Sequence, residues 1–207
     1  MLFLFLHSYE QLLQLRKDLM KKFLVVGLGN IGANYEQTRH NIGFKILDRY
    51  ADKKEITFED NRYASVAKSR IKGRQITFVK PSTLMNNSGR AVKYWMEKEK
   101  LAVDQILIIT DDLNIPFGTL RLKPKGSDGG HNGLKDINHF IGTQQFARLR
   151  FGIGAQYPVG QQINYVLSKW SEEEEEKLGE RLDKCCELIN SFVLQGLPNT
   201  MNQFNGT

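Results

Sequence analysis

The sequence has few of the residues on which several enzyme classes depend. Its 207 residues include only two cysteines, Cys185 and Cys186, and four histidines. Neighbouring positions of a helix point about 100° apart, so the two adjacent thiols are poorly placed to form a disulfide with each other. No group of cysteines and histidines has the spacing of a zinc site. We therefore expect a protein of a reducing compartment, the cytoplasm, with no metal and no other cofactor.

The apolar N-terminus is too short for a membrane span. Residues 1–6, MLFLFL, could not cross a bilayer, and they lack the basic region and the cleavage site of a signal peptide. A second methionine, Met20, stands just before the first strand-like segment. We expect residues 1–20 to be an extension outside the fold and residues 21–207 to form a single domain, with no membrane partner. Alternatively, leucines with some helical spacing place a short amphipathic helix on the domain: Leu12, Leu13, Leu15 and Leu19.

The charge balance is basic. Lysine and arginine number 29 against 23 aspartates and glutamates, which gives a net charge of +6 and an isoelectric point of about 9.2. An excess of this size is compatible with a polyanionic partner such as nucleic acid. It is equally compatible with a solvated surface that carries more lysine than glutamate.

Strand-like and helix-like segments alternate along the chain. Short apolar or alternating runs predict strands at 23–26, 63–68, 75–79, 105–110, 119–123 and 148–154, with 63–79 forming a hairpin. Helical spacing predicts helices over about 41–53, 89–100 and 134–141, and Ser171 with Glu174 forms a capping box that starts a last helix ending near Gln195. This order predicts a single-domain α/β protein, a three-layer α/β/α sandwich with a mixed, mostly parallel central sheet.

A dinucleotide fingerprint occurs after the first strand, but its context is wrong. Residues 27–32, GLGNIG, match G-x-G-x-x-G, a pattern that works when a helix begins within the glycine turn and holds a pyrophosphate at its N-terminus. Here the residues that follow are mostly polar, and the helical pattern begins only near Asn41. The spacing therefore disfavours a nucleotide cofactor.

Polar side chains follow the ends of several predicted strands. Ligands of open α/β sheets bind beyond the carboxyl ends of the strands, so these side chains are candidates for one common crevice: Asn30, His40, Asn86, Asp111, Asp112, His131 and Asn132. A histidine is the natural general base near neutral pH, a carboxylate can orient it, and asparagine amides can donate to an oxyanion. The nucleophile elbow G-x-S-x-G is absent, which favours water as the nucleophile. Asparagines in turns and Asp112 as a loop cap are the simpler structural interpretation.

Taken together, these segments resemble the bacterial type of peptidyl-tRNA hydrolase. The resemblance rests on GLGNIGANYEQTRHNIGF at 27–44, PSTLMNNSG at 81–89, DDLNIPFG at 111–118, GGHNGLKDI at 129–137 and FARLRFGIG at 146–154, and it covers about residues 22–200. Two positions depart from the family pattern: Ile31 stands where a proline is usual, and Asn114 where an aspartate is frequent.

The resemblance implies a role for each matched residue. His40 would activate water and Asp111 would orient it. Asn30, counted among the catalytic residues, would bind the peptide part and the tRNA end together with Asn86 and Asn132 and would steady the developing oxyanion. The substrate-binding set would be Tyr35, Asn41, Met85, Asn86, His131 and Asn132. The phosphates of tRNA would contact Lys123, Arg150 and Arg121, and Lys125 and Arg148 also flank the glycine loop. Residues 21–207 would then be a monomeric catalytic domain that hydrolyses the ester of peptidyl-tRNA.

Three other functions remain open at this point. A non-catalytic RNA-binding domain on the same scaffold would bind tRNA without releasing peptide, and the presence of both His40 and Asp111 argues against it. A nucleotide-dependent oxidoreductase would use the glycine motif. A nucleoside phosphorylase or an aminopeptidase-like enzyme would share a related α/β/α architecture, although the missing metal-ligand spacing disfavours the peptidase.

Overall fold

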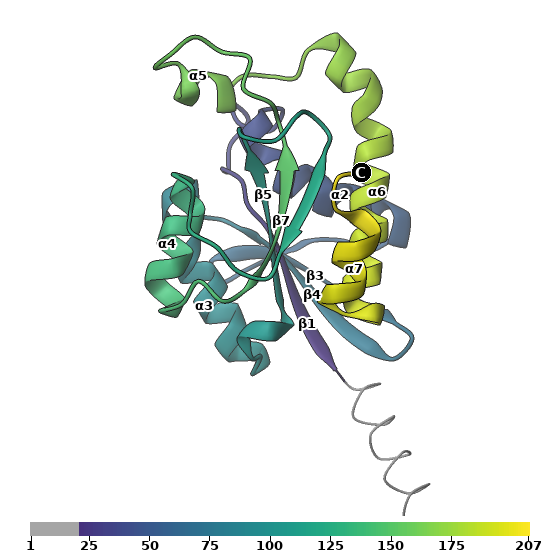
Figure 1. Cartoon of the computed structure of the whole chain (residues 1–207). Coiled ribbons are helices and arrows are strands. Elements are labelled where there is room, and N and C mark those ends of the chain that lie inside the picture. The colour runs from purple at the N-terminus through teal and green to yellow at the C-terminus, as the bar shows by residue number, and fades with distance from the viewer. Residues whose placement is uncertain (1–20) are drawn as a thin grey trace, which may run out of the picture.

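A central sheet lies between two layers of helices (Figure 1). The computed structural model describes residues 21–207. The strands are β1 (Lys22–Gly27), β2 (Glu59–Asn61), β3 (Ala64–Ile71), β4 (Arg74–Pro81), β5 (Ile106–Asp112), β6 (Leu120–Lys123) and β7 (Ala147–Gly152). The α-helices are α2 (Ile42–Lys54), α3 (Ser88–Glu99), α4 (Asn132–Ile141), α5 (Gln162–Val166), α6 (Glu172–Gln195) and α7 (Leu197–Phe204). Short 3-10 turns stand at Arg39–Asn41, Met85–Asn87 and Val103–Gln105.

The sheet is mixed and has the strand order β2-β3-β4-β1-β5-β7-β6. Strands β4, β1, β5 and β7 run parallel to one another, while β2, β3 and β6 run antiparallel to their neighbours. The carboxyl ends of β1 and β5 therefore meet at the same edge, and Gly27 pairs with Ile109 there. This edge is where the polar loops begin.

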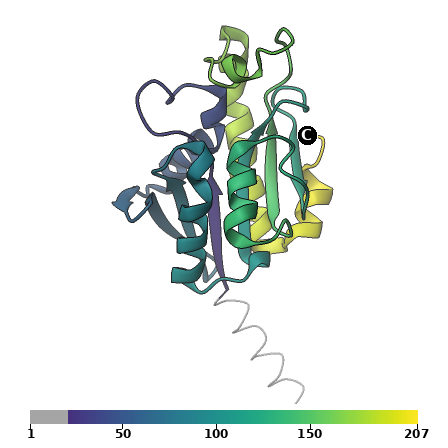
Figure 2. The ribbon, with the colours of Figure 1, turned by 90° about the vertical axis from the view of Figure 1, so that its left-hand side faces the viewer.

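Apolar side chains cover both faces of the sheet and make two cores. The helices α2, α6 and α7 pack on one face, where Tyr50 of α2 and Phe192 of α6 are buried. On the other face α3 and α4 stand side by side (Figure 2), and they bury Trp95 and Ile137. Strand β5 is buried along its whole length, because it has a strand on each side and a helical layer on each face. The sandwich predicted from the sequence is confirmed.

Several local predictions also agree with the structure. The turn at Lys72 and Gly73 joins the predicted hairpin, and both residues have positive φ. The capping box at Ser171 starts α6, where the Ser171 hydroxyl accepts from the backbone N–H of Glu174. Strand β2 and helix α7 were not predicted, because neither has a sustained apolar pattern in the sequence. The predictions for residues 1–20 lie outside the described residues.

The glycines of the fingerprint serve helix packing. A Cβ on Gly27 would lie 2.2 Å from the carbonyl oxygen of Gly43 in α2, and one on Gly29 would lie 2.7 Å from the ring of Phe44. Helix α2 begins only at Ile42, as the sequence pattern predicts. Since no helix starts in the glycine turn, the turn lacks the anion site that a dinucleotide needs. The structure thus gives the G-x-G-x-x-G match a structural explanation.

Candidate functional site

A cleft of about 420 Å³ opens at the carboxyl end of β5. One wall is the glycine loop, residues 125–131, and another is α5, which contributes Ile163 and Val166. His40, Asp111, His131 and Asn132 line the cleft together. With Asp112, the structure thus brings five of the seven crevice candidates proposed from the sequence into one cavity. A polar group at the base of a half-enclosed, partly apolar cleft is the usual form of a small-ligand or catalytic site.

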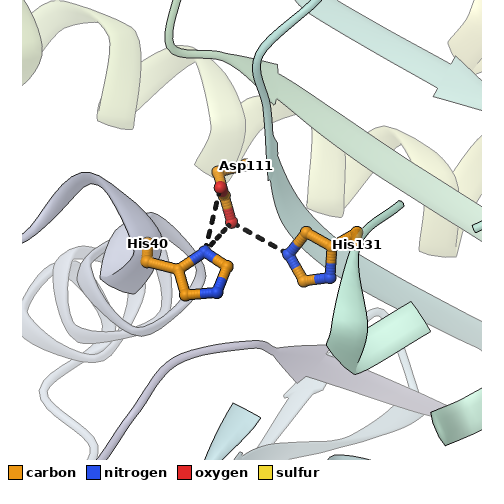
Figure 3. Close-up of side chains that lie close together, drawn as sticks. All are labelled: His40, Asp111 and His131. Atoms are coloured by element: carbon orange, nitrogen blue, oxygen red, sulfur yellow. Dashed lines mark hydrogen bonds and ion pairs between the residues drawn. The ribbon is translucent and has the colours of Figure 1, made fainter. Parts of the chain in front are cut away.

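Asp111 lies between two histidines at the base of this cleft (Figure 3). Nδ1 of His40 is 2.9 Å from Oδ1 and 3.0 Å from Oδ2 of the carboxylate, and Nε2 of His131 is 3.0 Å from Oδ1. The two rings stand 5.0 Å apart, centroid to centroid. His40 comes from the 3-10 turn before α2, Asp111 from the end of β5, and His131 from the N-cap of α4.

The hydrogen bonds fix the tautomer of each ring. Nδ1 of His131 accepts from the backbone N–H of Leu134, so its Nε2 carries the proton and donates to Asp111. A carboxylate only accepts, so Nδ1 of His40 is also a donor. Nε2 of His40 is then left with its lone pair, and it points away from Asp111 (Figure 3). That atom is free to take a proton from a water molecule.

Opposite effects set the protonation of the pair. Burial lowers the pKa of His40, but the charge of Asp111 and its hydrogen bond raise it more, so the pKa lies above the ordinary 6.5. Burial raises the pKa of Asp111, but both histidines lower it, and it ends well below its usual range. Asp111 is therefore ionised at neutral pH, and its negative charge stabilises a proton on His40.

The same three residues have the composition of a small metal site. The candidate ligand atoms of His40, Asp111 and His131 lie within 4.8 Å of one another. However, metal binding through Nε2 of His131 would remove the proton there, while Nδ1 still accepts from Leu134. A neutral imidazole cannot do both, because it keeps one N–H. The hydrogen bonding therefore fits a proton-transfer site better than a metal site.

Asn30 and Asn41 form a rigid support beside His40. The Asn41 side chain accepts from the backbone N–H of Asn30 at 2.8 Å and donates to its carbonyl oxygen at 2.9 Å. Oδ1 of Asn30 in turn accepts from the backbone N–H of Met85 at 2.7 Å. This fixes the orientation of the Asn30 amide, whose Nδ2 makes no hydrogen bond with residues 21–207. The arrangement leaves Nδ2 as a donor for a bound group, whereas Asn41 acts through the backbone of Asn30.

The other residues proposed to bind substrate lie around this support. Met85 is buried, and a Cβ on Gly133 would lie 2.7 Å from its sulfur, so Met85 packs against the first turn of α4. Asn86 and Asn132 are exposed, and only Asn132 lines the cleft. Tyr35 is half-buried, and its hydroxyl has no partner among residues 21–207. The structure thus places Asn86 and Tyr35 at the surface outside the cleft wall.

The basic residues divide into exposed and buried ones. Lys123 and Arg150 line the cleft, whereas Arg121 is exposed and does not. Nε of Arg150 forms an ion pair with Asp112, so the rest of its guanidinium can face a ligand.

Arg148 does not belong to an exposed basic face. It is only 1 % exposed, and it donates to the carbonyl oxygens of Ser127 and Gln144. Burial, together with the charge of Arg150, lowers its pKa to about 10. Arg148 therefore anchors the glycine loop from inside the protein. The expectation that it joins Arg150 on a basic face open to tRNA is corrected.

Arg39 positions the turn that carries His40, a role that the sequence patterns missed. Its guanidinium donates to the Ser168 hydroxyl and to Oε2 of Glu174, each at 2.6 Å, and to the carbonyl oxygen of Lys169. It also lies 4.5 Å from the ring centroid of Tyr165. These contacts tie the turn that carries His40 to α5 and to the start of α6. The only sequence signal was that a basic residue stands directly before His40. Its role cannot be inferred until the segment that it contacts, residues 168–174, is known.

The fold and the cleft together define an α/β protein with a histidine–aspartate pair suited to activating water. No helix within residues 21–207 has the length and apolar character needed to cross a bilayer. A family model described as peptidyl-tRNA hydrolase matches residues 24–207.

Curated relatives agree over nearly their whole length. A peptidyl-tRNA hydrolase of Bacteroides fragilis is 54% identical over 184 residues, which are 89% of this chain and 98% of the relative. One of Phocaeicola vulgatus is 53% identical over the same coverage. The chain belongs to the peptidyl-tRNA hydrolase family.

Solved structures support the same assignment. A crystal structure of a peptidyl-tRNA hydrolase from Acinetobacter baumannii has a TM-score of 0.83 and 35% identity, and the match covers 91% of this chain and 95% of that one. A 5′-methylthioadenosine nucleosidase of Arabidopsis thaliana has a TM-score of 0.52 at 7% identity. That second likeness concerns the fold alone.

Proposed function

We propose that this protein hydrolyses the ester between peptide and tRNA by means of a water molecule activated by His40. The observation that carries the proposal is the His40–Asp111 pair, in which Nδ1 is held at 2.9 Å from a buried carboxylate and Nε2 remains free. The family and the relatives support peptidyl-tRNA as the substrate. The mechanism is our own inference from the geometry.

The reaction needs one proton acceptor and one site for negative charge. Nε2 of His40 takes a proton as the water oxygen attacks the ester carbon, and Asp111 stabilises the imidazolium that forms. The carbonyl oxygen gains negative charge, which Nδ2 of Asn30 and the amide of Asn132 would stabilise, while Asn86, outside the cleft wall, would contact a more distant part of the substrate. As the tetrahedral intermediate collapses, the ester C–O bond breaks and His40 returns its proton to the ribose oxygen. Peptide and tRNA leave, and the enzyme is unchanged.

The chemical nature of the bond explains why a single base is sufficient. A ribose hydroxyl is a far better leaving group than an amine, so a covalent enzyme intermediate is unnecessary. General-base catalysis contributes about 10²–10⁴-fold, and positioning and oxyanion stabilisation supply the rest. The amides would also contact the peptide group of the substrate. An aminoacyl-tRNA has a charged amine there, and it would leave these donors unpaired.

The tRNA part would lie on the side of β7 and β6. Lys123 and Arg150 would contact its phosphates, with Arg121 adding charge further along β6. Tyr35, Met85 and His131 would shape the site for the end of the substrate. We propose that the enzyme acts as a monomer in the cytoplasm, where translation supplies peptidyl-tRNA, and that it needs no metal or other cofactor.

The experiment is a release assay on an N-blocked aminoacyl-tRNA with the wild type and His40→Ala. We expect the variant to lose release almost completely while it keeps its thermal unfolding midpoint and its affinity for tRNA. Turnover at the wild-type rate would contradict the mechanism. Addition of a chelator tests the cofactor separately, and a loss of wild-type activity would show that a metal takes part.

A further inference from the structure

A cluster of two arginines and two tyrosines lies outside the cleft, and the mechanism above does not use it. This arginine–tyrosine cluster consists of Arg62, Tyr63, Arg90 and Tyr94. The carbon of the Arg62 guanidinium is 5.1 Å from the ring centroid of Tyr63 and 5.2 Å from that of Tyr94. That of Arg90 is 5.9 Å from the Tyr63 centroid, and the two tyrosines meet edge to face at 5.6 Å. Both arginines are exposed.

The cluster is held in place from both sides. The indole N–H of Trp95 donates to the carbonyl oxygen of Arg62, and the backbone N–H of Ser82 donates to that of Tyr63. Tyr63 has a φ of +64°, a left-handed conformation that a non-glycine residue keeps only when its surroundings hold it. The tyrosine rings in turn restrict the two guanidinium groups. The cluster is therefore a pre-organised surface rather than a set of mobile side chains.

The charge of the cluster has no counterpart in the described part of the chain. Neither Arg62 nor Arg90 forms an ion pair with a carboxylate of residues 21–207. Asp60, two positions before Arg62, accepts a hydrogen bond from the Ser65 hydroxyl instead. Stacked guanidinium groups with free N–H donors suit carboxylates and peptide carbonyl groups. The cluster thus fits an anionic or carbonyl-rich ligand.

The sheet register places the cluster at the edge that carries the catalytic pair. Ala64 pairs with Pro81 at the carboxyl end of β4, and β4 runs parallel to β1 beside it. Along this edge the order is β6 and β7 with Lys123 and Arg150, then β5 with Asp111, then β1, then β4, then the turn before β3 with the cluster. The catalytic pair lies between the two basic groups.

We propose that the arginine–tyrosine cluster binds the peptide part of the substrate and prefers acidic side chains there. This inference rests on the proposed function. If tRNA occupies the side of Lys123 and Arg150, the ester lies at His40 and the peptide continues in the other direction, toward β4 and β3. Three strand spacings separate β5, which carries Asp111, from β3, about 14 Å, which is about four residues of extended peptide. The cluster then meets about the fourth residue from the ester.

The test compares tRNAs carrying peptides of about five residues that differ only at about the fourth position from the ester. That position is glutamate, alanine or lysine. For the wild type we expect kcat/KM to be about tenfold higher for glutamate than for lysine, with alanine between them. In the double variant Arg62→Gln/Arg90→Gln the three values converge. Arg70→Gln, at the opposite end of β3, is the matched control and keeps the preference.

The controls separate this proposal from the others. An N-blocked aminoacyl-tRNA has no fourth residue, so the double variant should hydrolyse it at the wild-type rate. Equal values of kcat/KM for the three peptides in the wild type would overturn the proposal, as would a preference that survives in the double variant. An equal loss on every substrate, together with weaker binding of deacylated tRNA, would assign the cluster to RNA instead. If the wild type fails even on the blocked aminoacyl-tRNA, the proposed function fails first.

Discussion

Replacement of Asp111 by asparagine tests the mechanism most directly. The change keeps the size of the side chain and removes its charge. Nδ1 of His40 then faces an amide, and the imidazolium formed in the transition state loses its counter-charge. Burial of the ring remains, and burial lowers the pKa of His40. The variant should therefore have both a slower reaction and a histidine that titrates at lower pH.

The size of the effect follows from the geometry. Unit charges about 4 Å apart at an effective dielectric constant of about 20 attract by about 4 kcal/mol. The His40 side chain is 13% exposed and that of Asp111 3%, so solvent screens the pair little. At about 1.4 kcal/mol per factor of ten, this corresponds to about 10³-fold in rate. An asparagine dipole retains part of the interaction, so we expect kcat to fall about 10²–10³-fold.

The assay is the dependence of kcat/KM on pH for an N-blocked aminoacyl-tRNA. For the wild type kcat/KM should rise with pH to a plateau, with a midpoint above 6.5 because the pKa of His40 is raised. In Asp111→Asn the midpoint should move to lower pH and the plateau should fall. Asp112→Asn is the matched control, because Asp112 contacts Arg150 and neither histidine, so the midpoint should stay in place. A midpoint shared by Asp111→Asn and the wild type would refute the reasoning.

Four further predictions concern stability, binding and reactivity. Because the pKa of His40 is raised on folding, the stability that its protonation contributes is complete below the unfolded-state pKa of about 6.5 and is lost as pH rises through the folded-state pKa. In urea unfolding, the stability of the wild type relative to His40→Asn should therefore fall between these two pKa values. Arg39→Gln leaves the Glu174 carboxylate without its ion-pair partner and should cost about 3 kcal/mol in urea unfolding, whereas Lys177→Gln breaks only an exposed pair and should leave the urea midpoint unchanged. Lys123→Ala combined with Arg150→Ala should flatten the log–log salt dependence of tRNA binding by about 0.7–0.9 per lost phosphate contact, while Lys100→Ala should leave the slope unchanged, and an unchanged slope in the double variant would exclude these contacts. Burial raises the pKa of Cys185, and that of Cys186 to about 11, so a thiol reagent should label both only after unfolding; rapid labelling of the native protein would contradict their burial.

The sequence was most informative where the physical signal is local. Alternating or apolar runs located six of the seven strands within residues 21–207, and the capping box located the start of α6 to the residue. The stretch at 33–41, between the glycine motif at 27–32 and the start of α2 at Ile42, was enough to disfavour a dinucleotide-binding site. Strand β2 could not be found in this way, because its residues are all exposed and polar. It exists because β3 offers it a free edge.

The site was predictable as a set of residues but not as a geometry. The motifs pointed to His40, Asp111 and His131. That both imidazole rings donate a hydrogen bond to the same Asp111 carboxylate depends on the tertiary fold, and no local pattern predicts it. The burial of Arg148 was not visible either, because strand alternation places it on the same face as Arg150 without telling which helices or loops cover it. Arg39 likewise acquires a role only through Ser168 and Glu174, some 130 positions further along the chain.

The consecutive placement of Arg39 and His40 restricts how the length of this region can vary. The Arg39 side chain is anchored to the segment that leads into α6, and the His40 side chain, one residue later, turns into the cleft. A single peptide unit therefore separates the anchoring residue from the general base. Inserting or deleting a residue between Thr38 and Ile42 would rotate the imidazole out of reach of Asp111. The exposed stretch at 31–37, apart from the half-buried Tyr35, has no such requirement, and insertions that natural or laboratory evolution tolerates should accumulate there.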